Sequence, residues 1–84
     1  MSAVTKTDGE GFQFVDIQTP RGVEKDVLLL EGMLMSNGER LYSMFDSVEL
    51  ARHPMADERC FGTIGGEVLT EELRAIAAKN SELL

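Results

Sequence analysis

The sequence predicts an α+β fold, in which a small antiparallel sheet of about three to four strands packs against a C-terminal helix. Three features support this prediction: turn-forming residues at 19–22 and 36–39, apolar segments beside both turns, and a capped amphipathic segment over 70–83. Pro and Gly in the first turn suit the second and fourth positions of a β-turn. The Asn-Gly pair in the second is typical of short hairpins, where residues with positive φ are needed.

Four segments are expected to form strands. Residues 12–18 alternate aromatic or β-branched residues with polar ones, which is typical of a strand with one buried face. Residues 23–35 form a second, longer strand, residues 40–45 a third and residues 59–64 a short fourth. Within the second strand, residues 27–35 are apolar at almost every position, so both faces of this strand need to be covered.

Two segments are expected to form helices. A short helix near 47–52 follows a possible capping sequence and ends before Pro54. The C-terminal helix over 70–83 starts at Thr70, a good capping residue, and carries carboxylates in its first turn. Asn80 interrupts the apolar stripe of this helix, and we expect it at the fraying, exposed end.

A mostly helical fold is the alternative, with helices near 21–36, 39–53 and 70–83. Leu, Met and Glu favour helices over strands. Apolar residues also recur at helical spacing in the first of these segments, at Val23, Val27, Leu30 and Leu34. The Pro-Arg-Gly turn and the Asn-Gly pair favour strands instead.

The chain is long enough for one domain. Its 84 residues divide into a flexible N-terminal tail over 1–11, which is polar and lacks periodicity, and a single globular domain over 12–84. A domain of this size buries roughly 60–70% of the surface that its unfolded chain exposes, so its core is small.

Charge and cysteine content exclude several classes of protein. Fifteen acidic and eight basic residues give a net charge of −7, which disfavours direct binding to nucleic acid. Neither a signal peptide nor a stretch of 18 apolar residues is present, so no membrane partner is expected. Cys60 has no second cysteine to pair with, and we expect a cytoplasmic protein.

Glu31 is a lone charge inside the apolar segment. An unpaired, buried carboxylate would cost several kcal/mol, so Glu31 must either reach solvent or find a partner. A β-bulge at Gly32 would turn it outward. Alternatively, Arg40 would lie opposite it across the hairpin.

His53, Asp57, Glu58 and Cys60 lie within eight residues and could bind a metal. Cys60 and His53 could also supply a nucleophile and its base. They suggest, as an alternative function, a small metal-dependent or cysteine-based enzyme or sensor. A zinc site usually needs four ligands, however, and the chain has one His and one Cys. We therefore expect no catalytic residues, no cofactor and no metal.

The favoured function is a small acidic, non-enzymatic protein-binding module, such as a regulator, inhibitor or adaptor. The predicted C-terminal helix covers one face of the sheet, and no comparable helix is predicted for the other. Large exposed apolar patches usually mark interfaces. We expect self-association as a homodimer, binding to a larger basic protein, or both. The expected interface residues are Val27, Leu28, Leu30, Met33, Leu34 and Met35.

Overall fold

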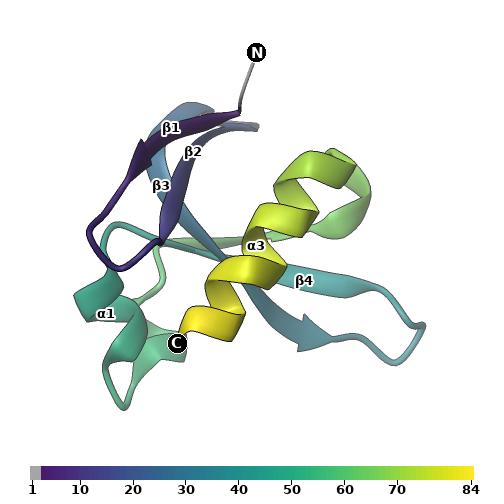
Figure 1. Cartoon of the computed structure of the whole chain (residues 1–84). Helices are drawn as coiled ribbons and strands as arrows, with labels where there is room; N and C mark the ends of the chain where they lie inside the picture. Colours follow the sequence, from purple (N-terminus) through teal and green to yellow (C-terminus); the bar gives the residue numbers. More distant parts are fainter. Residues whose placement is uncertain (1–2) are drawn as a thin grey trace.

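The computed structural model describes residues 3–84 as a five-stranded antiparallel sheet with three α-helices and a short 3-10 helix (Figure 1). Strands that are consecutive in the chain are neighbours in the sheet, in the order β1-β2-β3-β4-β5. The α+β class is therefore confirmed. The elements are β1 (Val4–Thr7), β2 (Gln13–Thr19), β3 (Gly22–Leu34), β4 (Arg40–Phe45), α1 (Val48–Arg52), α2 (Ala56–Arg59), β5 (Gly62–Gly65), η1 (Gly66–Val68) and α3 (Glu71–Leu83).

Both predicted hairpin turns form. In the first, Thr19 pairs with Gly22, and the Thr19 hydroxyl donates to the Gly22 carbonyl at 2.8 Å. Gly22 has a φ of +116°, which glycine adopts readily. In the second, the Met35 amide donates to the Glu39 carbonyl at 2.6 Å. Only Gly38 has a positive φ there, +87°. Two positive φ values were predicted from the Asn-Gly pair, so that detail is wrong.

The predicted loose tail is wrong for residues 4–7, which form the edge strand β1. This strand pairs with β2, and the Thr5 hydroxyl donates to the Phe14 carbonyl at 3.2 Å. The Asp8 carboxylate accepts the amides of Glu10 and Phe12 and thereby closes the connecting turn. Because β1 is largely exposed, its strand conformation comes from pairing rather than from burial.

The helical alternative does not form over 21–36 or 39–53, where the structure places β3, β4 and only five residues of α1. β3 runs through the whole molecule and pairs with both β2 and β4 (Figure 1). Its central residues alternate between two cores, one on each side of the sheet. Burial on both faces suits a central strand but leaves no polar side for a surface helix.

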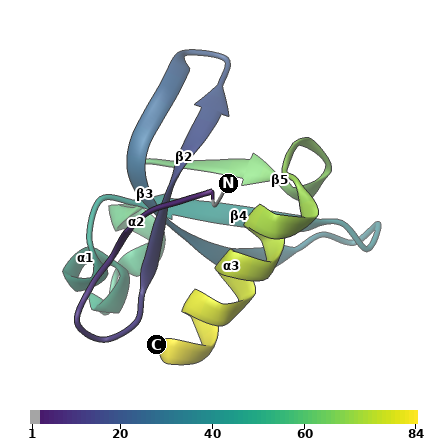
Figure 2. The ribbon, with the colours of Figure 1, turned by 45° about the horizontal axis from the view of Figure 1, so that its top comes forward.

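The helix α3 covers one face of the sheet (Figure 2). Thr70 caps it as predicted, its hydroxyl accepting the Leu73 amide at 3.1 Å. Ile76 and Ala77 are buried in the core on this side. Leu69, which follows η1, also belongs to this core. The strands contribute its remaining buried members, Val15, Ile17, Val27, Leu29, Tyr42 and Met44.

Asn80 is fully buried, so its predicted exposed position is wrong. Its side-chain carbonyl accepts the Gln13 amide at 3.0 Å, and its amide group donates to the carbonyls of Gln13 at 2.9 Å and Leu29 at 3.1 Å. Those three backbone groups lie where β2 begins beside β3. Asn80 thus joins α3 to both strands with bonds that a leucine could not make.

The short helices α1 and α2 lie against the opposite face. α1 begins at Ser47, whose hydroxyl accepts the Leu50 amide at 3.3 Å, and Ala51 is buried against the sheet. α2 is a single turn. The second core lies beneath them and contains Phe12, Phe14, Leu28, Leu30, Phe45 and Ala51. The second face is therefore covered in part, where the sequence predicted cover for one face only.

Within residues 3–84, none of the helices has the length and apolar character needed to cross a lipid bilayer.

Candidate functional site

Three of the six predicted interface residues are inside the molecule. Val27, Leu28 and Leu30 are at most 4% exposed. Val27 faces α3, whereas Leu28 and Leu30 face α1. Val27 and Leu28 pack inside their own chain and are not available to a partner, whereas Leu30 also lines the groove described below. Val27 is buried beneath α3, and Leu28 and Leu30 are buried because α1 and α2 cover a face that the sequence left open.

The other three residues form an exposed apolar tip, which comprises Met33, Leu34 and Met35. Their exposed fractions are 69%, 59% and 39%. They lie at the end of β3, where the β3–β4 hairpin projects beyond the helices (Figure 1). Neither core reaches that far along the strand, so these side chains meet solvent.

A groove of about 490 Å³ adjoins this tip on the sheet face that α1 and α2 cover only in part. Its floor comes from β3, β4 and β5, and its wall from α1, α2 and the following residue, Cys60. Apolar side chains predominate, and Met33 belongs to both the tip and the groove. The lining consists of Leu30, Glu31, Gly32, Met33, Leu41, Ser43, Phe45, Ala51, Ala56, Asp57, Cys60, Thr63 and Leu84.

A bulge in β3 shapes the end of the groove near the tip. The pairing of β3 with β4 shifts between Glu31 and Leu34, as predicted for Gly32. A Cβ on Gly32 would lie 2.9 Å from the Leu41 carbonyl oxygen, which is too close, so glycine is required there. The Arg40 guanidinium donates to the Gly32 carbonyl at 3.1 Å.

Glu31 is exposed, in agreement with the first of the two arrangements predicted for it. Its backbone amide donates to the Ser81 hydroxyl at 2.9 Å, which ties β3 to the end of α3. Arg40 instead binds the Gly32 carbonyl, so the predicted pairing of Arg40 with Glu31 is not the arrangement found.

Of the predicted cluster of His53, Asp57 and Cys60, the last two line the groove and His53 lies outside it. The His53 ring nitrogen Nδ1 accepts the Met55 amide at 3.0 Å, outside the groove. The Cys60 thiol donates to the Asp57 carbonyl at 3.4 Å, and both of these residues line the groove. Within residues 3–84, no three His, Cys, Asp or Glu side chains are grouped closely enough to hold a metal ion.

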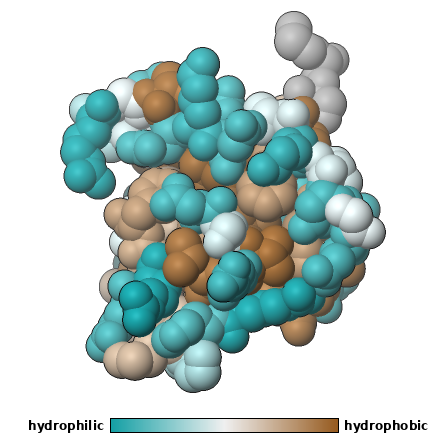
Figure 3. Space-filling view, turned by 90° about the vertical axis from the view of Figure 1, so that its left-hand side faces the viewer, coloured by the Kyte–Doolittle hydropathy of each residue, from teal (hydrophilic) through white to brown (hydrophobic). Residues whose placement is uncertain are grey.

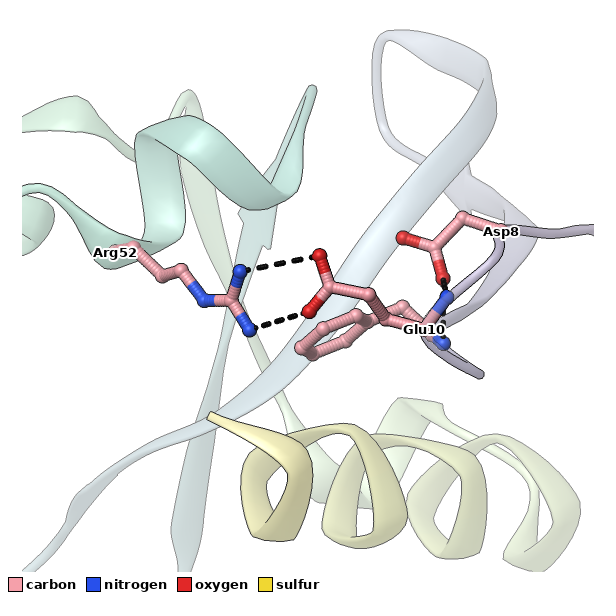
Figure 4. Close-up of polar contacts among 4 residues, drawn as sticks. Asp8, Glu10 and Arg52 are labelled. Atoms are coloured by element: carbon pink, nitrogen blue, oxygen red, sulfur yellow. Dashed lines mark hydrogen bonds and ion pairs between the residues drawn. The ribbon is translucent and has the colours of Figure 1, made fainter.

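Arg52 connects α1, which forms part of the groove wall, to the turn between β1 and β2 (Figure 4). Its guanidinium donates to both carboxylate oxygens of Glu10, at 3.2 and 2.7 Å, and lies 5.4 Å from the centre of the Phe12 ring. The hydrogen bond to Glu10 raises the pKa of Arg52 above its ordinary value. These contacts join α1 to the β1–β2 turn, which Asp8 closes.

The side of the molecule that carries α1 is not uniformly apolar. Viewed from that side, hydrophobic side chains lie in small areas with hydrophilic side chains between them (Figure 3). Apolar side chains on this side are therefore interspersed with polar ones rather than gathered in one large patch.

Sequence reasoning missed the part of the groove that comes from β4, α1 and α2. The face of β4 that contributes to the groove was predictable, because residues alternate between the two faces of a strand. Leu41, Ser43 and Phe45 share one face, opposite Tyr42 and Met44. This alternation did not indicate where α1 and α2 would pack. The helix α2 was not predicted, since a single helical turn has almost no periodicity.

Searches against models of protein families, against curated proteins and against solved structures return no match for this chain.

Proposed function

We propose that this chain is a non-enzymatic protein-binding module, acting as a regulator, inhibitor or adaptor through the tip and the groove. One observation carries the proposal. Three consecutive large apolar side chains are exposed at the end of β3, and Met33 connects them to an apolar hollow. Exposed apolar side chains around a hollow offer the anchoring points from which protein interfaces gain most of their affinity.

Because Val27 and Leu28 are buried, the proposed contact surface is limited to the tip and the groove lining, which includes Leu30. A flexible side chain such as Met33 or Met35 suits this role, because methionine adapts its shape to a partner. The bound partner is either a second copy of the chain, as in the expected homodimer, or a different protein.

The alternative based on His53, Asp57 and Cys60 has weaker support. Cys60 and Asp57 face the groove, whereas the described bond of His53 closes the turn at Met55. A base that activates a thiol must lie within hydrogen-bonding reach of it. The contact described for the thiol is with a backbone carbonyl.

The test compares two positions of equal exposure. A photo-crosslinking amino acid replaces Met33, which is 69% exposed, or Val68 in η1, which is 66% exposed. In the native cell, we expect discrete cross-linked protein species from position 33 and only weak, diffuse labelling from position 68. Equal labelling from both positions would contradict the proposal. Sedimentation velocity at micromolar concentration then reports whether the bound partner is a second copy.

A further inference from the structure

The charges around the groove are of one sign. Glu31 lies at the end next to the tip and Asp57 lies in the α2 wall, and both are exposed. Within residues 3–84, the groove lining contains no Lys, Arg or His. Arg40, the nearest cation along β4, donates to the Gly32 carbonyl instead. Any occupant thus meets an apolar floor with the exposed acidic residue Asp57 in its wall.

A second copy of the chain is a poor match for such a groove. Each copy carries a net charge of −7, and a symmetric dimer would bring the same carboxylates together. Like charges placed across an interface disfavour association, and charges of opposite sign select the partner. Screening by salt limits this attraction to charges within about 8–10 Å of each other at ordinary salt concentrations. The charges of a segment that lies in the groove would be within this distance.

We propose that the groove binds a segment of another protein in which large apolar side chains are flanked by Lys or Arg. This inference rests on the proposed function and adds the chemistry of the partner to it. The apolar side chains of the segment contact Leu30, Leu41 and Phe45. Its cations lie beside Asp57, which is exposed in the wall of the groove.

The experiment selects ligands without presuming a sequence. Random dodecamers displayed on phage are selected on the immobilised full chain, and a synthetic peptide of the enriched sequence is titrated by fluorescence anisotropy. We expect enriched peptides with at least two large apolar residues and a net positive charge. The dissociation constant should rise as salt concentration increases.

A matched pair of variants separates binding in the groove from general attraction to an acidic protein. Asp57→Lys and Glu58→Lys make the same change of charge at neighbouring exposed positions of α2, but only Asp57 lines the groove. We expect Asp57→Lys to weaken binding at least tenfold and Glu58→Lys less than threefold. Equal weakening by the two variants would overturn the inference, because the attraction would then be non-specific.

Met33→Glu distinguishes failure of this inference from failure of the proposed function. If neutral or acidic peptides are enriched and Met33→Glu abolishes their binding, the basic partner is wrong while the proposed function stands. If Met33→Glu has no effect on any enriched peptide, the proposed function fails as well. A stable dimer that Met33→Glu dissociates would identify the occupant as a second copy and overturn the inference.

Discussion

The two faces of the sheet are covered in very different ways. On one face, the 13-residue helix α3 lies across the strands and is joined to β2 and β3 by the buried side chain of Asn80. On the other, α1 has five residues and α2 has four, and the groove lies beside them. The difference shows how a small domain can place its buried side-chain hydrogen bonds on one face of the sheet and leave the other face available for contact with a partner.

The largest expected effect comes from removing the buried amide on the α3 face. Asn80→Ala leaves three backbone groups of Gln13 and Leu29 without their partner. Each unsatisfied buried group costs about 1–3 kcal/mol, so we expect a loss of about 3–5 kcal/mol in the free energy of unfolding. Urea denaturation followed by circular dichroism measures it.

Ser81→Ala is the control for Asn80→Ala, since it removes a single hydrogen bond from the next position of the same helix. We expect a loss below about 1 kcal/mol for this partly exposed group. If the two variants lose similar stability, then Asn80 is not the main connection between α3 and the sheet.

The second prediction compares adjacent leucines of β3 that face opposite sides. Leu29, on the α3 side, is fully buried, and Leu30, at 4% exposure, lines the groove. Truncating a buried leucine costs about 2–5 kcal/mol, the upper part of this range applying where a closed cavity remains. We expect about 4 kcal/mol for Leu29→Ala and about 2 kcal/mol for Leu30→Ala, because the Leu30 site already opens to solvent. Thermal and urea unfolding of both variants give the comparison, and a larger loss for Leu30→Ala would contradict it.

Local chemistry made the hairpins and the capped C-terminal helix predictable from sequence. Thr19–Gly22, Gly38 and Thr70 act through bonds within a few residues, so their roles are visible in the sequence itself. Val4–Thr7 could not be identified in this way, because its strand conformation comes from pairing with β2.

The candidate site was predictable only in part. The tip consists of apolar residues next to the Asn-Gly turn: Met33, Leu34 and Met35, which the sequence predicted as interface residues, are exposed in the structure. The groove depends on how α1 and α2 pack against β4, which is a tertiary arrangement. Burial of Asn80 was missed for the same reason, since its partners are 67 and 51 residues away in the chain.

The third prediction concerns the bulge that shapes the groove. In Gly32→Ala the added methyl group would approach the Leu41 carbonyl oxygen to 2.9 Å, and backbone atoms must move to accommodate it. We expect a loss of about 1–2 kcal/mol and weaker binding of peptides to the groove. Gly9→Ala serves as the control, because nothing lies within 4 Å of its added Cβ. Equal stability of the two variants would show that β3 and β4 separate easily at this point.

The smallest expected effect tests how firmly the wall of the groove is held. Arg52→Gln removes the paired hydrogen bonds to Glu10. Because both side chains are about half exposed, at 46% and 57%, global stability should change little. Local opening of α1 should become more frequent, since its connection to the β1–β2 turn is lost.

Hydrogen exchange of the α1 amides measures this effect. Arg59→Gln on α2 is the control, because it also removes an exposed cation. Faster exchange in Arg52→Gln alone would mean that this ion pair positions the wall without stabilising the fold, whereas unchanged exchange would leave the packing of Ala51 as the main restraint on α1.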